Sequence, residues 1–159
     1  TKNNKFAICR FANVTNTNGS VIPFWLSQKE KNESLKLTDK NMNRLMFSQK
    51  SAVNLINDSV NYCENNGGGF IASSFMKSVN MYDLAKVISD DVEIVGLRPG
   101  ERLDEKLISE KELPFTYIEN NLILLKKELN LGENKLNEEY SSRTVGKMNK
   151  QDILELING

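Results

Sequence analysis

Three polar clusters of the sequence hold the side chains best suited to bind an anion. They are residues 10–14 together with 19–23, residues 37–44, and residues 96–102. Arg44 and Arg98 carry planar, permanently charged guanidinium groups that can bind phosphate oxygens through two parallel hydrogen bonds. Glu101 follows Arg98 by three residues across a Pro-Gly turn. A carboxylate in that position can accept hydrogen bonds from the two neighbouring hydroxyls of a ribose.

Asn13 adds a side chain that can both donate and accept hydrogen bonds. Two arginines, one carboxylate and one amide would suit a nucleoside diphosphate that carries a sugar. An exposed arginine is nevertheless most often a solvated charge, and Arg-Pro-Gly-Glu is by itself a turn signal. Residue types and spacing alone therefore support no more than an α/β chain that binds anions.

Composition excludes several classes of protein. The chain has 159 residues, of which 39% are hydrophobic and 26% charged, so it can bury a core of about one domain. Its 21 basic and 21 acidic residues cancel, which argues against a dedicated nucleic-acid binder. The sequence has no histidine, so histidine-based triads, zinc sites and proton shuttles are excluded.

The two cysteines, Cys9 and Cys63, cannot make a four-thiolate metal site, and we expect two reduced thiols in a cytoplasmic protein without a bound metal. No apolar run reaches the length of a membrane span, and we expect no signal peptide. We therefore expect no membrane partner. The chain opens at Thr1, only five residues before the apolar run that begins at Phe6, and we expect a piece of a longer polypeptide.

Predicted helices and strands interleave along the chain, which indicates an α/β or α+β class. We expect helices at 22–31, from Ser48 to Cys63, after Asn80, and from Asn149 onward, and strands at 6–11, 35–37, 70–72, 92–95, 106–108, 116–118 and 122–125, the last being a strand or a buried edge. Residues 13–20 are predicted to be a loop, and 132–139 are polar.

Helix signals are clearest in three places. Ser48 can cap a helix whose apolar face would consist of Ala52, Leu55, Ile56, Ser59, Val60 and Cys63. Asn80 can cap the next helix, with Val79 and Leu84 forming a hydrophobic staple. The last helix would bury Ile153, Leu154, Leu156 and Ile157.

The three polar clusters each follow the carboxyl end of a predicted strand, where open α/β sheets bind ligands. A complete dinucleotide-binding domain would begin with a strand, a Gly-x-Gly-x-x-Gly turn and a helix, and that motif does not occur in the sequence. Residues 67–69 are three glycines, but they follow a predicted helix and precede a strand, the reverse of the order that binds phosphate. We interpret them as a helix stop and a turn.

The same clusters resemble a known family, the UDP-N-acetylglucosamine 4,6-dehydratases, which are extended short-chain dehydrogenase/reductase enzymes of polysaccharide biosynthesis. Residues 10–14 (RFANV) and 19–23 (GSVIP) resemble their R-Y-G-N-V and G-S-V-I-P segments. Residues 37–44 (LTDKNMNR) are similar to L-T-D-x-x-M-T-R, and residues 96–107 (GLRPGERLDEKL) to G-x-R-P-G-E-K-L-x-E-x-L. Residues 139–142 (EYSS) resemble the family's tail, and the matches keep their order over almost the whole chain.

The resemblance implies an α/β fold made of the last strands and helix of a Rossmann-like NAD(P)-binding domain and a small α/β substrate-binding domain. Residues of about 1–33 and 46–75 would complete the Rossmann sheet, and about 34–45 and 76–159 would bind the UDP-sugar. The chain would be the C-terminal half of its parent, with the cofactor turn and every catalytic residue upstream. The parent would use NADP or NAD to oxidise carbon 4 of the sugar, would remove water across carbons 5 and 6, and would return the hydride to carbon 6.

The resemblance also assigns roles to seven residues. Asn13 would contact the sugar-diphosphate region, Ser20 and Val21 would border the nucleoside, and Thr38 would lie beside the uracil. Arg44 and Arg98 would bind the diphosphate, and Glu101 the ribose hydroxyls. Five positions depart from the family pattern: Ala12 for glycine, Asn18 for arginine, Asn43 for threonine, Arg102 for lysine and Asp104 for histidine.

Three functional hypotheses stay open at this point. The first is the substrate-binding part of a UDP-sugar 4,6-dehydratase, in a parent that is a homo-oligomer. The second is a UDP-sugar 4-epimerase or a bifunctional dehydratase/epimerase of the same superfamily. The third is a stand-alone nucleotide-binding module without catalysis. The residues that would separate these hypotheses lie upstream of this sequence.

Overall fold

A computed structural model of the chain describes residues 5–158, so Thr1 lies outside the described residues. Helices and strands interleave, and the mixed α/β class predicted from the sequence is confirmed. The chain forms two compact units. Unit 1 comprises Thr1–Phe11, Lys50–Phe75 and Lys106–Tyr140, and unit 2 comprises Ala12–Gln49, Met76–Glu105 and Ser141–Gly159. The assignment of segments to a cofactor domain and a substrate part stays a prediction.

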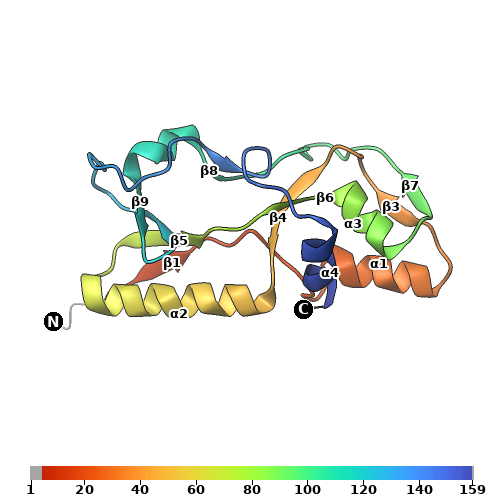
Figure 1. Cartoon of the computed structure of the whole chain (residues 1–159), viewed down its shortest axis with the longest axis horizontal. Coiled ribbons are helices and arrows are strands. Elements are labelled where there is room, and N and C mark those ends of the chain that lie inside the picture. The colour runs from red at the N-terminus through yellow and green to blue at the C-terminus, as the bar shows by residue number, and fades with distance from the viewer. Residues whose placement is uncertain (1–4, 159) are drawn as a thin grey trace. The chain divides into compact units, whose positions relative to one another are not determined.

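Unit 1 contains a four-stranded sheet in the order β1-β5-β10-β9. Figure 1 labels three of these strands, β1, β5 and β9. β1 (Ala7–Cys9) runs parallel to β5 (Phe70–Ser74), whereas β10 (Leu122–Leu125) is antiparallel to both β5 and β9 (Thr116–Glu119). Because β10 has a strand on each side, the 122–125 run is an inner strand of the sheet. Asn120 and Asn121 join β9 to β10 with φ angles of 49° and 64°, a left-handed conformation that asparagine tolerates in tight hairpins.

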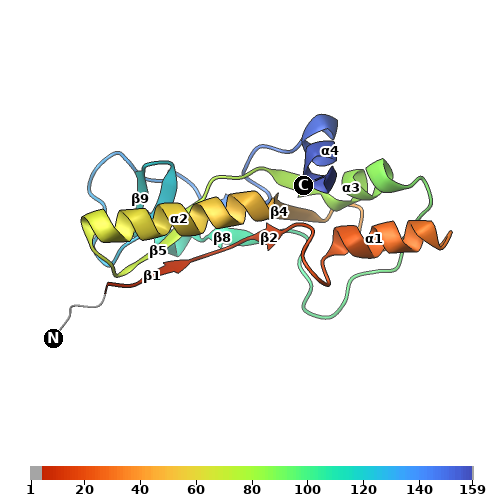
Figure 2. The same ribbon diagram turned by 90° about the horizontal axis from the view of Figure 1, so that it is seen from below.

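α2 (Gln49–Asn66) lies alongside β1 and β5 in both views of unit 1 (Figure 1, Figure 2). Its buried residues are Leu55, Ser59, Tyr62 and Cys63. The Cys9 thiol on β1 lies 3.4 Å from the Ser59 hydroxyl, and the Tyr62 ring meets the Phe70 ring edge-on. These contacts fix the helix on one face of the sheet.

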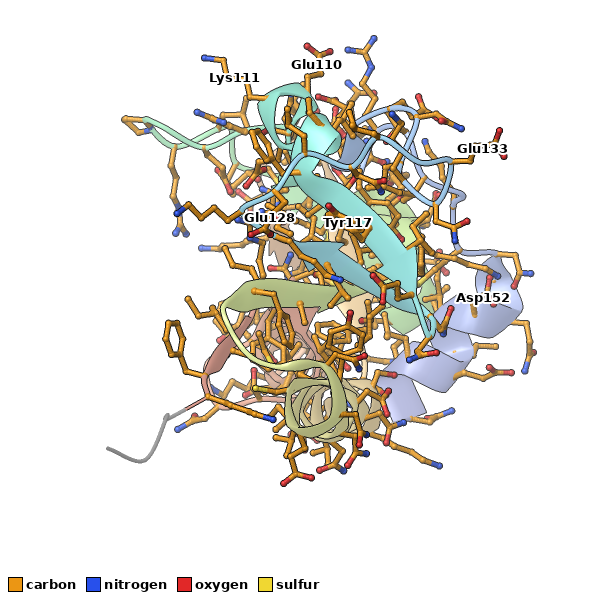
Figure 3. The ribbon with its side chains drawn as sticks, turned by 90° about the vertical axis from the view of Figure 1, so that its left-hand side faces the viewer. Glu110, Lys111, Tyr117, Glu128, Glu133 and Asp152 are labelled. Atoms are coloured by element: carbon orange, nitrogen blue, oxygen red, sulfur yellow. The ribbon has the colours of Figure 1, made fainter. Side chains whose placement is uncertain are left out.

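A hydrogen-bonded triad joins α2 to the β9–β10 hairpin. Lys126 Nζ lies 2.6 Å from Glu119 Oε1 and donates to the Tyr62 hydroxyl at 2.7 Å, and this hydroxyl donates to Glu119 Oε2 at 2.7 Å. The Lys126 ammonium also lies 4.5 Å from the ring centroid of Tyr117, which is labelled on β9 in Figure 3. Each polar group of the triad therefore has a partner.

The rest of unit 1 consists of short elements. They are β8 (Lys106–Ile108) and the 3-10 helix η1 (Glu110–Phe115). β11 (Tyr140–Ser141) lies where the chain passes from unit 1 to unit 2. Arg10 follows β1 and donates to the Leu107 carbonyl and to Glu112 on η1, each at 2.8 Å. This arginine of the first polar cluster is therefore engaged inside unit 1.

Unit 2 is built on two small sheets. In the first, β4 (Asn43–Phe47) lies between β2 (Asn13–Val14), which is parallel to it, and β6 (Ser78–Asn80), which is antiparallel. In the second, β3 (Leu35–Leu37) and β7 (Val92–Ile94) are parallel, with Leu37 opposite Ile94. The parallel pairing brings the carboxyl ends of β3 and β7 to the same edge.

Three helices share one core with these strands: α1 (Val21–Glu30), α3 (Met81–Ile88) and α4 (Lys150–Asn158). Asn80 caps α3 as predicted, because its side chain accepts hydrogen bonds from the backbone of Tyr82 and Asp83. Val79 and Leu84, the predicted staple pair, are both 0% exposed. The largest buried side chain is Trp25, whose indole donates to the Lys36 carbonyl at 3.1 Å.

The structure differs from the sequence-based predictions at several places. Residues 13–20 are not all loop, because Asn13–Val14 forms β2, and Asn43–Phe47 forms the unpredicted strand β4. The sequence does not predict β4 because Leu45, Met46 and Phe47 are all buried. Apolar and polar residues therefore do not alternate along this strand as they do in a strand with one exposed face. Ile56 and Val60 on α2, and Leu154 on α4, were predicted to be buried, but they are 45%, 50% and 38% exposed.

Candidate functional site

All seven residues predicted to bind a ligand line one cavity of unit 2. The cavity has a volume of about 600 Å³. Its lining includes Asn13, Ser20, Val21, Thr38, Arg44, Arg98 and Glu101. The structure thus brings these residues together, although they come from three separate clusters of the sequence. Their individual roles in binding stay predictions.

Thr38 and Arg98 reach the cavity because β3 and β7 end side by side. The Val95 amide donates to the Leu37 carbonyl at 2.8 Å, which extends the pairing beyond the strands. The chain then turns at Gly96 and Gly100, whose φ angles of 86° and 83° are ones that side-chain-bearing residues rarely adopt. The second and third polar clusters therefore meet at the carboxyl edge of a parallel pair, as the sequence predicts for ligand-binding loops.

The Glu101 carboxylate organises the loop that carries Arg98. Its Oε2 atom accepts a hydrogen bond from the Arg98 amide at 3.1 Å, and the Glu101 amide donates to the Arg98 carbonyl at 3.0 Å. The Thr38 hydroxyl lies 3.4 Å from Oε1. Since a carboxylate has about four acceptor sites, Glu101 keeps capacity for ligand hydroxyls while it holds the turn.

The two arginines of the cavity differ in their surroundings. Arg44 lies within β4, with its side chain only 12% exposed, and pairs through Nε with Glu105 Oε1 at 3.2 Å. It was expected to follow a strand, and it is instead the second residue of one. Arg98 is exposed, and within the described part of the chain no contact engages its guanidinium group. One arginine is therefore fixed and the other is free to close on a ligand.

The amino end of α1 forms another part of the cavity wall. Ser20 occupies the cap position, but its side chain makes no capping hydrogen bond, and its buried Oγ atom has no partner within the described residues. Val21 is the first residue of the helix. Helix amino ends carry a partial positive charge and unpaired amide groups, which favour an anion nearby. This end of α1 adds to the positive character that the arginines give the cavity.

Several lining residues were not predicted from the sequence. Phe24, Trp25 and Lys36 also line the cavity, and Phe24 is 54% exposed. The signal that could have found the aromatic pair is its place directly after Pro23, within the first turn of a helix whose start was already a candidate. Phe24 offers a flat apolar surface on which a nucleobase can stack.

The triple glycine at residues 67–69 has a role in packing and is not arranged as a phosphate-binding turn. The triple glycine follows α2 and precedes β5, and Gly68 serves to admit the backbone of Phe6. A Cβ atom at Gly68 would lie 2.5 Å from the Phe6 carbonyl oxygen. The glycine run thus has a packing role. Within residues 5–158, no group of three or more Cys, Asp or Glu side chains lies where it could hold a metal ion.

A family comparison agrees with these features. Residues 1–127 match the model of a family described as "Polysaccharide biosynthesis protein". The chain belongs to this family. The resemblance to this polysaccharide-biosynthesis family, stated from the sequence motifs, is thereby confirmed.

Relatives in the family carry two different names. The chain is 31% identical over 119 residues to a UDP-N-acetylglucosamine 4,6-dehydratase (inverting) of Campylobacter jejuni, covering 73% of this chain and 35% of that protein. It is 27% identical over 169 residues to a UDP-glucose 4-epimerase of Rickettsia bellii, covering 96% and 49%. A third relative, 30% identical over 166 residues with the same coverage, is named an uncharacterized membrane protein of Methanocaldococcus jannaschii.

A solved structure shares the fold. The X-ray structure of Pen from Bacillus thuringiensis superposes with a TM-score of 0.83 at 24% identity, covering 97% of this chain and 49% of that one. The chain therefore spans about half the length of the relatives that match it along nearly all of its residues. None of the described helices is long and apolar enough to cross a membrane.

Proposed function

We propose that the chain is the substrate-binding portion of a UDP-sugar 4,6-dehydratase, a lyase that acts on UDP-N-acetylglucosamine in nucleotide-sugar and polysaccharide biosynthesis. The observation that carries the proposal is the meeting of Arg44, Arg98 and Glu101 at one cavity beside the amino end of α1. Two guanidinium groups and a helix amino end suit a diphosphate, and a carboxylate beside them suits a ribose.

Each part of the ligand has a proposed partner in the cavity. Arg44 and Arg98 would hold the diphosphate, and Glu101 would accept the ribose hydroxyls. Thr38 would lie beside the uracil, and Ser20 and Val21 would border the nucleoside. Asn13 lies on β2, which pairs with the strand that carries Arg44, and it would face the sugar-diphosphate region.

Catalysis and the cofactor would belong to an upstream Rossmann half with which this chain pairs. NADP or NAD would supply a hydride acceptor and donor there, and the chain alone would neither bind the cofactor nor turn over substrate. The packing role of Gly68 supports this division, because the glycine run of this chain is occupied by its own backbone. A cytoplasmic, homo-oligomeric parent is part of the same proposal.

The proposal is tested with the full-length protein. We expect calorimetry to show binding of UDP but not of free N-acetylglucosamine. Incubation with UDP-N-acetylglucosamine and the cofactor should then give a product lighter by one water, detected by mass spectrometry. Binding of UDP without any product would contradict the dehydratase assignment and favour a non-catalytic nucleotide-binding module.

A 4-epimerase is the second candidate, and the coverage of the relatives favours it. The epimerases of Rickettsia match 94–96% of the chain, whereas the dehydratases of Campylobacter match 73%. An epimerase would convert UDP-glucose to its carbon-4 epimer without loss of mass. Chromatographic separation of the two epimers after incubation with UDP-glucose distinguishes this outcome from dehydration, and the appearance of both products would indicate a bifunctional enzyme.

A further inference from the structure

Glu105 is a carboxylate that touches two residues of the cavity wall without lining the cavity itself. Its Oε2 atom accepts a hydrogen bond from Asn13 Nδ2 at 2.7 Å, and its Oε1 atom lies 3.2 Å from Arg44 Nε. Asn13 lies on β2 and Arg44 on β4, so one side chain connects two neighbouring strands. Both of its partners line the cavity, and Glu105 is not among the described residues that do.

The backbone of Glu105 is itself fixed by a buried residue. The Ser142 hydroxyl accepts from the Glu105 amide at 3.0 Å, and the Ser142 amide donates to the Glu105 carbonyl at 2.9 Å. Ser142 is 0% exposed. The Ser142 hydroxyl also donates to Asp104 Oδ1, which accepts from Asn43 on β4. Glu105 is therefore held at its main chain before its side chain reaches the strands.

The contacts of Arg44 determine which part of its guanidinium group is left for a ligand. Nε faces Glu105, and Nη1 donates to the carbonyls of Asn43 at 2.9 Å and Leu103 at 3.2 Å. A guanidinium group has five N–H bonds, and these contacts use three of them. Among the described contacts, the Nη2 amino group keeps both of its hydrogens for the cavity.

The amide of Asn13 is oriented in the same way. Its two Nδ2 hydrogens point to the Leu45 carbonyl at 3.0 Å and to Glu105 at 2.7 Å. Its oxygen is then the atom left to face a ligand, and it can only accept a hydrogen bond. Without Glu105, only the Leu45 carbonyl would hold the Nδ2 end of the amide in place.

We propose that Glu105 is a positioning residue, which orients the Arg44 guanidinium and the Asn13 amide before the nucleotide binds. The inference rests on the proposed function, because it assigns a role at the same cavity. A negative charge beside Arg44 would by itself weaken the attraction for phosphate. Fixing the Arg44 and Asn13 side chains offsets this weaker attraction, since a side chain that is already oriented loses less conformational freedom on binding.

The test compares Glu105→Gln with the wild-type full-length protein by calorimetry. Glutamine keeps the size of the side chain, but its NH2 group replaces one of the two oxygens and would face a donor of Asn13 or Arg44, so it cannot accept from both as the carboxylate does. We expect the affinity for UDP and for inorganic pyrophosphate to fall about tenfold, the equivalent of one charge-assisted hydrogen bond, while the affinity for uridine stays unchanged. Glu112→Gln, which removes a carboxylate from Arg10 in unit 1, is the matched control and should leave all three affinities unchanged.

A double-mutant cycle separates positioning from a general effect on stability. In an Arg44→Ala background, Glu105→Gln should weaken pyrophosphate binding no further, because the guanidinium group that it positions is gone and the exposed oxygen of Asn13 cannot donate to a phosphate. Arg44→Lys, which keeps the charge and lacks the fork of N–H groups, should weaken UDP binding as much as Glu105→Gln does. Unfolding midpoints in urea, measured for every variant, show whether each variant is folded under the conditions of the binding measurement.

The outcomes for the two proposals are distinct. Wild-type protein without affinity for UDP would overturn the proposed function. Wild-type protein that binds UDP, with unchanged or tighter binding in Glu105→Gln, would overturn the positioning role alone. Equal losses of UDP and uridine affinity would also overturn it, because the carboxylate would then act on the fold as a whole.

Discussion

The Thr38 hydroxyl lies 3.4 Å from Glu101 Oε1 and connects the loops that follow the parallel strands β3 and β7. The second oxygen of the same carboxylate accepts from the Arg98 amide. Glu101 therefore contacts both Thr38, which we propose lies beside the uracil, and Arg98, which we propose binds the diphosphate. Substitutions of Glu101 and of Arg98 can therefore test the proposed binding of the nucleoside and of the diphosphate separately.

Arg98→Ala should weaken UDP binding by about tenfold or more. A charge-assisted hydrogen bond to phosphate contributes roughly 1.5–3 kcal/mol, and Arg98 is the exposed arginine of the cavity, with its guanidinium group available. Calorimetry on the full-length protein measures the change. Arg143→Ala, at an exposed arginine that does not line the cavity, is the control. Unchanged UDP affinity in Arg98→Ala would remove Arg98 from the site.

Glu101→Gln should weaken UDP binding and spare inorganic pyrophosphate. The reason is that a carboxylate accepts hydrogen bonds from both ribose hydroxyls, which pyrophosphate lacks. Titration with 2′-deoxy-UDP gives an independent check, because its affinity should already be low in the wild-type protein. If UDP and pyrophosphate weaken together, the contacts of Glu101 with Thr38 and the Arg98 amide are its main role, and the ribose assignment is wrong.

Gly68→Ala should destabilise the fold by about 2 kcal/mol or more. An added Cβ would lie 2.5 Å from the carbonyl oxygen and 2.6 Å from the amide nitrogen of Phe6, and the backbone at Phe6 cannot swing away as a flexible side chain could. The neighbouring Gly69 amide donates to the same carbonyl at 2.7 Å, so a shift also strains this bond. Urea unfolding monitored by circular dichroism measures the loss.

Gly146→Ala is the matched control for that substitution, because an added Cβ there meets no atom within 4 Å and the backbone is not left-handed. Its unfolding midpoint should stay within experimental error of the wild type. Equal stability of Gly68→Ala and Gly146→Ala would show that the backbone at Phe6 can move enough to accept a side chain at position 68.

Local signals made much of unit 2 predictable from the sequence. Asn80 predicts the start of α3 because the side chain of a cap residue accepts hydrogen bonds from the amides of the first helical turn. Leu84 and Ile88 then follow at helical spacing. The predicted site residues met at one cavity because Thr38 and Arg98 each follow a strand of a parallel pair. That argument needs only the direction of the strands and not their exact register.

Non-local contacts account for the parts that could not be predicted. β4 is covered on both sides, so its sequence shows no alternation, and its placement depends on pairing with β2 and β6. Glu105 resembles an ordinary surface charge in the sequence, because its partners Asn13 and Arg44 are distant along the chain. Such a role becomes visible only when the strands are placed side by side.

Glu119→Gln should reduce stability near neutral pH, and the loss should vanish in acid. The hydrogen bond from Lys126, together with that from Tyr62, lowers the pKa of the Glu119 carboxyl below its ordinary value of 4.5. A depressed pKa contributes stability that is present above 4.5 and is lost as the pH falls through the lower, folded value. Since the pair is partly exposed, we expect a loss of about 0.5–1 kcal/mol at pH 7.

Urea unfolding at a series of pH values measures this difference. The wild type should lose stability more steeply than the variant as the pH falls below 4.5. Glu110→Gln, at an exposed residue of η1, should follow the wild-type curve. A difference between Glu119→Gln and the wild type that stays constant with pH would show that the triad acts through packing alone.

Residues 1–159 produced alone should self-associate, and should neither bind NADP nor dehydrate UDP-N-acetylglucosamine. Among the described residues β1 pairs with a strand on one side only, and proteins rarely leave such an edge exposed. Phe6 and Ile8 beside this edge are 67% and 55% exposed, and Val53, Ile56 and Val60 form an exposed apolar stripe on α2. Light scattering measures the mass, and Ile56→Lys with Val60→Lys should shift it toward the monomer.

Leu131→Lys, at a residue that is 91% exposed and outside the stripe, should leave the mass unchanged. A clean monomer of the unmodified chain would mean that the edge and stripe need no cover, and dehydration by this chain alone would place the catalytic groups within it.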